Sequence, residues 1–524
     1  MAIDTLVQDA IVVHRKSPTT SQRKLGETET SYYLPSRESG VNDMYLHLGF
    51  KASTGRLTPD RFLLVWAILR LRHPLLAARI ELCAYDDIRF IYDHPKDIEE
   101  TLRSAQQAME LCSQTKDELI DNYLNGQRTL SNDRLSFLIL SSLQTFSLQN
   151  GTESENEQEF DLLICAAHFI GDGMALHTFA NEFFVLLGGK LNESELRNLL
   201  ELEVKQFAKD RKGFILPSTV EDQLPLLSQS KFFKAATKID FKLSQRKLVG
   251  GQSFPKVHHP LRHTVVPTVS FDPLRTKSIL RTCKTNGVSI SSALFAICNI
   301  AWARTHKKNP EAPVMMYTAL NLRPYLKAEK ALNDSYWFLA IGYFNIILPA
   351  FLPQSCDGVR ATFWHRAKSA KKQSADAAKH PLIVHRTLEM ARERGSRARV
   401  WARQDDDRAG VTVPSVSLPA SVSLDNVPVP ECLVGSSKAP STALIGLSML
   451  GNLDGIYKHI DYHDLELHTL TTGSRQRPGG MLLFGYTFVG KLWVSLGYDE
   501  NGFDKEIVGT FWKNVLSAVD ELLM

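Results

Sequence analysis

Cysteine is scarce in this 524-residue chain, and its seven cysteines are scattered singly. No CxxC pair is present, so the sequence offers no structural zinc site of that type. An odd number of unclustered cysteines is typical of a protein in a reducing compartment. Cys165 and Cys298 lie in apolar stretches, where we expect buried free thiols.

Several other signals are missing. No run approaches the ~18 apolar residues that a membrane helix needs, and neither a GxGxxG motif nor a P-loop is present. The first nine residues carry an acid early and lack the apolar segment of a signal peptide. A net charge of +4 is small for this length and argues against a nucleic-acid-binding protein. We therefore expect a cytoplasmic protein without a transmembrane segment; a peripheral membrane contact stays open.

The stretch from His168 to Gly173, His-Phe-Ile-Gly-Asp-Gly, is the most informative. It follows an almost unbroken apolar run at 160–167, short enough for a buried strand, and precedes a segment at 174–187 with helical spacing. A histidine at the end of a buried strand is held rigidly and can face a cleft. This placement suits a general base, although a histidine at a strand end is more often structural.

Helical and strand patterns recur on both sides of residues 216–260, a region that is rich in Gly, Pro, Ser and Lys toward its end. With 44% hydrophobic residues, the chain can form two or more domain cores. We predict an α/β (α+β) protein with an N-terminal domain at 1–215, a crossover linker at 216–260 and a C-terminal domain at 261–524. The expected elements include a helix at 57–73, a hairpin at 79–92, strands at 135–148 and 160–168, a strand at 264–271, helices at 272–286 and 291–306, a strand at 313–320, strands at 443–450, 465–471, 481–489 and 491–499, and a helix at 506–523.

Two regions give weak patterns. Residues 1–30 have no clear period and are expected to form a loose lead-in. Residues 354–440 are the least regular: a helix is expected at 361–379, and an extended loop at 413–440. Positive charge is concentrated at 366–408.

The pattern His168-x-x-x-Asp172-Gly173 resembles the signature of the coenzyme-A-dependent acyltransferase superfamily. This superfamily includes chloramphenicol acetyltransferase, plant acyltransferases of natural-product pathways and condensation domains of peptide synthetases. The likeness is greatest to the fungal trichothecene 15-O-acetyltransferase type of the alcohol-acetyltransferase-like branch. The D-F-G-W-G motif of the plant branch is missing. Four further stretches agree in order and spacing: LRHPLL at 71–76, LPSTVED at 216–222, GVSISSAL at 287–294 and NLRPYL at 321–326.

The resemblance implies two chloramphenicol-acetyltransferase-like domains with mixed sheets and an active-site channel at their interface. His168 would be the general base that takes a proton from an acceptor hydroxyl, while Asp172 would pair with Arg323 and hold the loop. The reaction would move an acetyl group from acetyl-CoA to a small natural product, such as a terpenoid of the trichothecene kind. It would need no bound cofactor, no metal and no covalent intermediate. We expect a monomer.

Four further residues are candidates for the site. Gly173 would let the backbone turn tightly at the helix start. Ser448 lies in a predicted strand that faces the channel in many family members, so it could donate to the oxyanion; a hydroxyl on a sheet edge is the alternative. Arg397 and Arg399 could bind the phosphates of coenzyme A, or they could lie on a solvated helix face.

Two other kinds of catalytic site, a serine hydrolase site and a zinc site, have incomplete motifs in this sequence. The stretch from Gly446 to Gly451 is one residue too long for the GxSxG motif of a hydrolase. His168, Asp172 and His177 lack the third strong ligand of a catalytic zinc site. Two alternatives stay open: a condensation-type enzyme that takes its acyl group from a carrier protein, and an inactive relative that acts as a binding protein.

Overall fold

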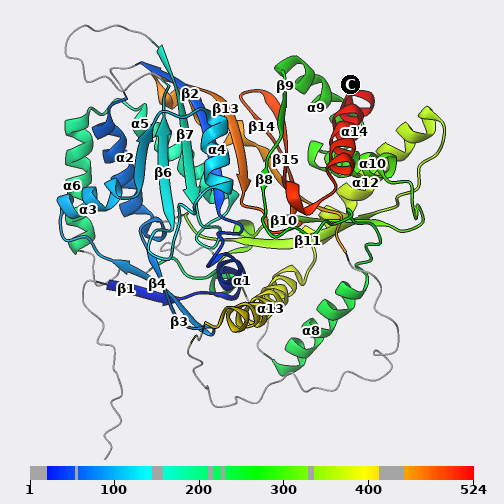
Figure 1. Ribbon diagram of the computed structural model, residues 1–524, viewed down its shortest axis with the longest axis horizontal. Coiled ribbons are helices and arrows are strands. Elements are labelled where there is room, and N and C mark those ends of the chain that lie inside the picture. The colour runs from blue at the N-terminus through cyan, green and yellow to red at the C-terminus, as the bar shows by residue number, and fades with distance from the viewer. Residues whose placement is uncertain are drawn as a thin grey trace, which may run out of the picture.

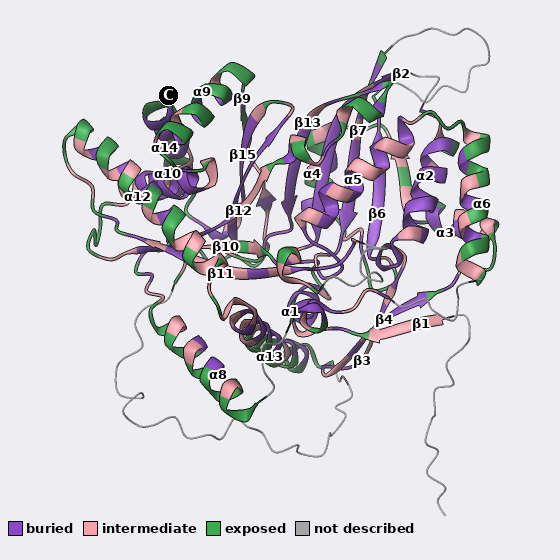
Figure 2. Cartoon of the chain, turned by 180° about the vertical axis from the view of Figure 1, so that it is seen from behind, coloured by how far each residue is buried: buried purple, intermediate pink, exposed green. Residues whose placement is uncertain are grey.

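The computed structural model describes residues 20–53, 57–143, 157–209, 216–225, 230–327, 336–411, 413 and 442–524. Within these ranges, two large mixed sheets lie side by side, with helices at both outer sides and a small third sheet below the first (Figure 1). Buried residues are concentrated in the strands and on the helix faces turned toward them (Figure 2). Cys165 and Cys298 are buried free thiols, as expected.

The first large sheet has the strand order β13-β2-β7-β6-β5. Its central pairs are antiparallel, and β5 and β6 are parallel. The strands are β2 (Met44–Ser53), β5 (Met109–Cys112), β6 (Ser136–Ser141), β7 (Glu157–Ala166) and β13 (Leu465–Ser474). The helices that pack around it are α2 (Pro59–Arg72), α3 (Ile98–Gln106), α4 (Lys116–Asn125), α5 (Gly173–Leu187) and α6 (Glu193–Lys209).

The second large sheet has the order β11-β10-β12-β14-β15-β8, and β9 also pairs with β15. Its strands are β8 (Thr264–Val265), β9 (Thr268–Phe271), β10 (Val314–Asn321), β11 (Ile341–Leu348), β12 (Ile445–Asn452), β14 (Met481–Phe488) and β15 (Lys491–Asp499). It is packed by α9 (Pro273–Thr285), α10 (Ile290–Thr305), α12 (Cys356–Ala378) and α14 (Lys505–Leu523). Buried side chains of this sheet and these helices form a second apolar core.

The small sheet and three helices complete the lower part of the molecule (Figure 1). The small sheet has the order β1-β4-β3. Its strands are β1 (Thr20–Lys24), β3 (Arg79–Ala84) and β4 (Asp87–Asp93), and the helices are α1 (Glu27–Ser36), α8 (Lys231–Arg246) and α13 (Ile383–Ala409). The short helix α7 (Val220–Gln223) and the turn η1 (Pro74–Leu76) lie between longer elements.

The two halves of the sequence are interwoven. Strand β13 comes from the second half, yet it pairs with β2 over its whole length, from Leu465 opposite Ala52 to Ser474 opposite Met44. Helix α13 also comes from the second half and packs on α1. The first apolar core therefore includes residues from both ends of the sequence. The division at 216–260 stays a prediction.

Most of the elements expected from the sequence are present. They include α2 with Thr58 as its N-cap, the β3–β4 hairpin, the β6–β7 pair and the turn from β7 into α5. Helices α9 and α10 are separated by a turn in which Gly287 has a φ of +71°, a backbone conformation that favours glycine.

Two expectations were wrong. The described part of the lead-in, residues 20–30, forms β1 and the start of α1, because β1 gains backbone hydrogen bonds from β4 although its side chains are polar. The region from 354 carries two long helices, α12 and α13, and not only the short helix expected at 361–379. The extended loop at 413–440 lies almost entirely outside the described residues.

Across the described ranges, no single helix has both the length and the apolar composition needed to cross a membrane. The bent pair of α9 and α10 meets these two criteria jointly, with 94° between its helices.

Candidate active site

His168 lies in the turn that joins β7 to α5, where it is half-buried. Its Nδ1 is 3.1 Å from the carbonyl oxygen of Gly171. A carbonyl oxygen can only accept a hydrogen bond, so Nδ1 carries the proton in this contact. In the neutral ring, Nε2 is then the unprotonated nitrogen, and it has no hydrogen-bond partner among the residues that the structure describes. This tautomer leaves Nε2 available as a base.

Three aromatic and basic side chains from distant parts of the sequence form a cluster next to the imidazole, which Tyr32 contacts directly. The ring of Tyr32, in α1, is stacked on His168 with 4.3 Å between ring centroids and 27° between planes. The Tyr32 hydroxyl contacts that of Tyr343, in β11. The guanidinium of Arg394, in α13, lies 5.2 Å from the Tyr32 ring centroid and 4.2 Å from that of Tyr343. The stack fixes the plane of the imidazole, and α13 supplies a cation beside it.

The surroundings of His168 lower the pKa of its imidazole from the ordinary 6.5. Burial has the largest effect, because it penalises the charged ring, and the positive charge of Arg394 acts in the same direction. Hydrogen bonding to backbone carbonyls and the charge of Asp172 raise the pKa but do not offset the burial. The ring is therefore neutral at pH 7, as a general base must be.

Asp172 is the N-cap residue of α5 and is buried. Its Oδ1 accepts hydrogen bonds from the backbone N–H groups of Met174 and Ala175, at 3.0 and 3.1 Å, which caps the helix. Its two carboxylate oxygens each lie 2.9 Å from Nη1 of Arg323, and Oδ2 accepts a further bond from the backbone of Ala340 at 2.8 Å. The carboxylate thus accepts from four donor groups and connects the turn after β7 to Arg323 and Ala340.

Arg323 is held from its other side as well. Its Nη2 donates to the carbonyl oxygens of Phe338 and Tyr336, at 2.9 and 3.4 Å, and its guanidinium lies 4.9 Å from the ring centroid of Phe338. The structure thus brings together the two residues that the sequence pattern paired. They lie at the junction between β7 of the first sheet and β10 of the second.

The glycines of the turn are required by space. A Cβ at Gly173 would lie 3.0 Å from Cδ2 of Leu450, and one at Gly171 would lie 3.1 Å from Nε1 of Trp337. Neither glycine is among those with a positive φ. A Cβ at either position would press on a neighbouring side chain. The role expected for Gly173, a tight backbone turn at the helix start, stays a prediction.

Ser448 lies on β12, half-buried, two residues before the Leu450 that packs against Gly173. In the sheet it is opposite Phe484 of β14. Its hydroxyl makes no hydrogen bond with any described residue. The hydroxyl of Ser448 is thus on the strand that packs against the turn after β7 through Leu450, and its role at an oxyanion stays a prediction.

Arg397 and Arg399 are both on α13, but their surroundings differ. Arg397 is exposed, with its guanidinium 5.8 Å from the ring centroid of Trp401. Arg399 pairs with Glu27 at 2.7 Å and with Asp86 at 3.1 Å, so it ties α13 to the lower part of the first half. Neither contacts His168; their role toward coenzyme A stays a prediction.

Sequence reasoning missed Tyr32, which stacks on His168, and the two residues that contact Tyr32 from other elements. Tyr32 and Tyr343 carried no motif, and Arg394 was one of several arginines in the basic segment. The buried positions of α13 are mainly small residues, Ala391, Gly395, Ala398 and Ala402, and Arg394 borders this face. That stripe of small residues is the signal that could have singled out Arg394.

Comparisons with known proteins show which solved structures share this fold. No protein-family model matches the chain, and no curated protein matches its sequence. Among solved structures, the TRI3 trichothecene 15-O-acetyltransferase from Fusarium sporotrichioides superposes with a TM-score of 0.73 at 13% identity, over 96% of this chain and 95% of that one.

Two domains of peptide synthetases have the same fold at lower similarity. The first condensation domain of the CDA synthetase has a TM-score of 0.56 at 12% identity, over 96% of this chain and 97% of that one. The epimerization domain from the third module of tyrocidine synthetase B has a TM-score of 0.55 at 11% identity, over 97% and 99%. The predicted fold class is therefore confirmed: the chain has the mixed α/β fold of this acetyltransferase and these domains.

Proposed function

We propose that the protein is an acyl-CoA-dependent O-acyltransferase that moves an acetyl group to a hydroxyl of a small natural product, such as a terpenoid of the trichothecene kind. The observation that carries the proposal is the state of His168. A neutral imidazole with a free Nε2 is fixed beside a fully satisfied Asp172–Arg323 pair. The fold shared with an acetyltransferase supports the same conclusion.

In the proposed reaction, Nε2 of His168 takes the proton of the acceptor hydroxyl while that oxygen attacks the thioester carbonyl. The carbonyl oxygen becomes an oxyanion, which needs a hydrogen-bond donor, and Ser448 is the candidate. The carbon–sulfur bond then breaks, and the coenzyme A thiolate leaves with the proton returned by His168. The new ester is released, so protons and electrons balance without a covalent enzyme intermediate.

The direct test is incubation with acetyl-CoA and a panel of hydroxylated terpenoids. We expect free coenzyme A to be released only when an acceptor is present, together with a product that has gained one acetyl group. Thiol release without an acceptor would indicate a thioester hydrolase. No release with any acceptor would contradict the proposal. Because two structural neighbours are peptide synthetase domains, a second assay offers the acyl group on a carrier protein.

The pH dependence of the reaction should reflect the lowered pKa of His168. The base must be unprotonated, so kcat/KM should be constant down to about pH 6.5 and fall only below that value. Replacing Arg394 with glutamine removes a nearby positive charge and should move the acidic limb to higher pH. Arg397→Gln removes the same charge from the exposed face of α13 and should leave the limb in place. An acidic limb above pH 6.5 in the unmodified protein would contradict this account.

A role for Arg397 in binding acyl-CoA can be separated from a structural role for Arg399. Arg397→Gln should raise the apparent KM for acyl-CoA about three- to tenfold, because one phosphate contact is lost. Arg399→Gln should lower the midpoint of thermal unfolding, because Glu27 loses its partner and Asp86 keeps only Arg403. An unchanged KM in Arg397→Gln would remove that residue from the binding site.

A further inference from the structure

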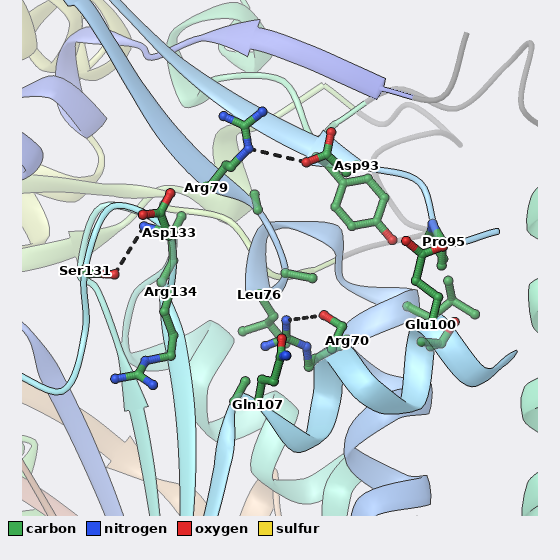
Figure 3. A pocket seen from close by; sticks show the side chains of 18 residues that line it. Arg70, Leu76, Arg79, Asp93, Pro95, Glu100, Gln107, Ser131, Asp133 and Arg134 are labelled. Carbon is green, nitrogen blue, oxygen red and sulfur yellow. Dashed lines mark hydrogen bonds and ion pairs between the residues drawn. The ribbon is translucent and has the colours of Figure 1, made fainter. Parts of the chain in front are cut away.

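A pocket of about 500 Å³ lies in the first half of the chain, and His168 is not among the residues that line it. Its walls come from the end of α2, from η1, from α3 and from the β3–β4 hairpin, and the 131–135 segment closes one side (Figure 3). None of the residues described above around His168 lines it. The pocket is therefore separate from the proposed acyl-transfer site.

Arg70 is the notable charge in this pocket. Arg70 is only 9% exposed. Nη2 donates to the hydroxyl of Ser104 at 3.2 Å, and the guanidinium lies 5.3 Å from the ring centroid of Trp66. Within the described ranges, it pairs with no carboxylate. Burial lowers the pKa of Arg70 to about 10, so the side chain still carries its charge at pH 7.

The other charged side chains in the wall already have partners or face solvent. Arg79 pairs with Asp93 at 3.3 Å. Arg134 donates to the carbonyl oxygen of Thr129, and Glu100 accepts from a backbone N–H at 2.8 Å. Asp133 is exposed at the rim. Arg70 is thus the buried cation with unused donors, and in Figure 3 it lies centrally, beside Leu76 and Gln107.

A buried charge without a counter-ion is costly, and a guanidinium presents a planar fork that matches a carboxylate or a phosphate. Beside Arg70, the wall also offers apolar surface from Leu76, Tyr92 and Leu135. We propose that this pocket binds a small organic anion, a carboxylate or a phosphate monoester. The anionic group contacts Arg70, and the apolar part lies against these three side chains.

The test uses two probes that share one apolar part, benzoate and phenyl phosphate, with benzyl alcohol as the uncharged control. Binding to the full chain is measured by calorimetry and by the shift of the thermal unfolding midpoint, without acyl-CoA. At least one anion should bind saturably and raise the midpoint, and benzyl alcohol should do neither. Preference between benzoate and phenyl phosphate identifies the anionic group that the site accepts.

Arg70→Met keeps an unbranched apolar side chain and removes the guanidinium with its charge, so it should weaken binding of the anion about tenfold or more. Arg103→Met removes the same charge from an exposed position on α3 outside the pocket and should bind as the unmodified chain does. Ser104→Trp fills the pocket from an exposed position and should also block binding if Arg70→Met does not fold. The proposal is overturned if neither anion binds the unmodified chain, or if a folded Arg70→Met or Ser104→Trp variant binds equally well.

Discussion

Replacement of His168 with alanine is expected to lower kcat/KM for acyl transfer by about 10²–10⁴-fold without changing the fold. The imidazole is half-buried, and its contacts among the described residues are one hydrogen bond to the carbonyl of Gly171 and the stack on Tyr32, so the variant loses one ring contact but no ion pair or helix cap. The proton of the acceptor hydroxyl would then have to leave without a positioned base. The measurement is the rate of acceptor-dependent thiol release, beside the circular dichroism spectrum and the unfolding midpoint.

A matched control separates this effect from the loss of any histidine. His258 is exposed and lies outside the site, so His258→Ala should keep full activity. His168→Ala with near-normal turnover would remove the general-base mechanism. Lost turnover together with a large fall in the unfolding midpoint would assign His168 a structural role instead.

Replacement of Asp172 with alanine is expected to destabilise the protein by about 3–5 kcal/mol, because Arg323 would be left without its counter-ion. The loss of the helix cap adds about 1 kcal/mol. Activity should also fall, since the turn that carries His168 would lose its connection to the 321–340 segment. The measurements are chemical unfolding and thiol release on the same preparation.

Asp504 provides a control for the cap alone. It starts α14 and accepts hydrogen bonds from the backbone N–H groups of Glu506 and Ile507, at 3.0 and 3.1 Å, as Asp172 does at α5. No described arginine pairs with it. Asp504→Ala should therefore cost only about 0.5–2 kcal/mol. If Asp172→Ala costs no more than this, the ion pair does not hold the two segments together.

The local elements could be predicted from the sequence because their signals are local. The turn from β7 into α5 is marked by an apolar run followed by helical spacing, and α2 by a cap and a proline. Helix α13 escaped this reasoning because half of the residues that it buries are alanine or glycine and only one, Leu388, is a large apolar residue. Small residues allow close packing on α1 but produce no visible stripe of large apolar side chains.

The candidate site could be predicted only where a motif marks it. His168, Asp172 and Arg323 stand in recognisable patterns, and the structure brings the last two into contact. Tyr32 of α1 stacks on His168, and Tyr343 of β11 and Arg394 of α13 contact Tyr32. These contacts depend on packing between segments far apart in the sequence. Sequence periodicity reports which face of an element is buried, but it does not report which partner covers that face.

The pairing of β13 with β2 determines when the first sheet can be completed during synthesis. Until the ribosome has released Ser474, β2 has one unpaired edge, and exposed edges invite pairing with other chains. The first sheet therefore closes only near the end of translation, and contacts this distant in sequence form slowly. A fragment that stops before Leu465 would expose that edge permanently, so the N-terminal half is a poor candidate for expression as an isolated domain.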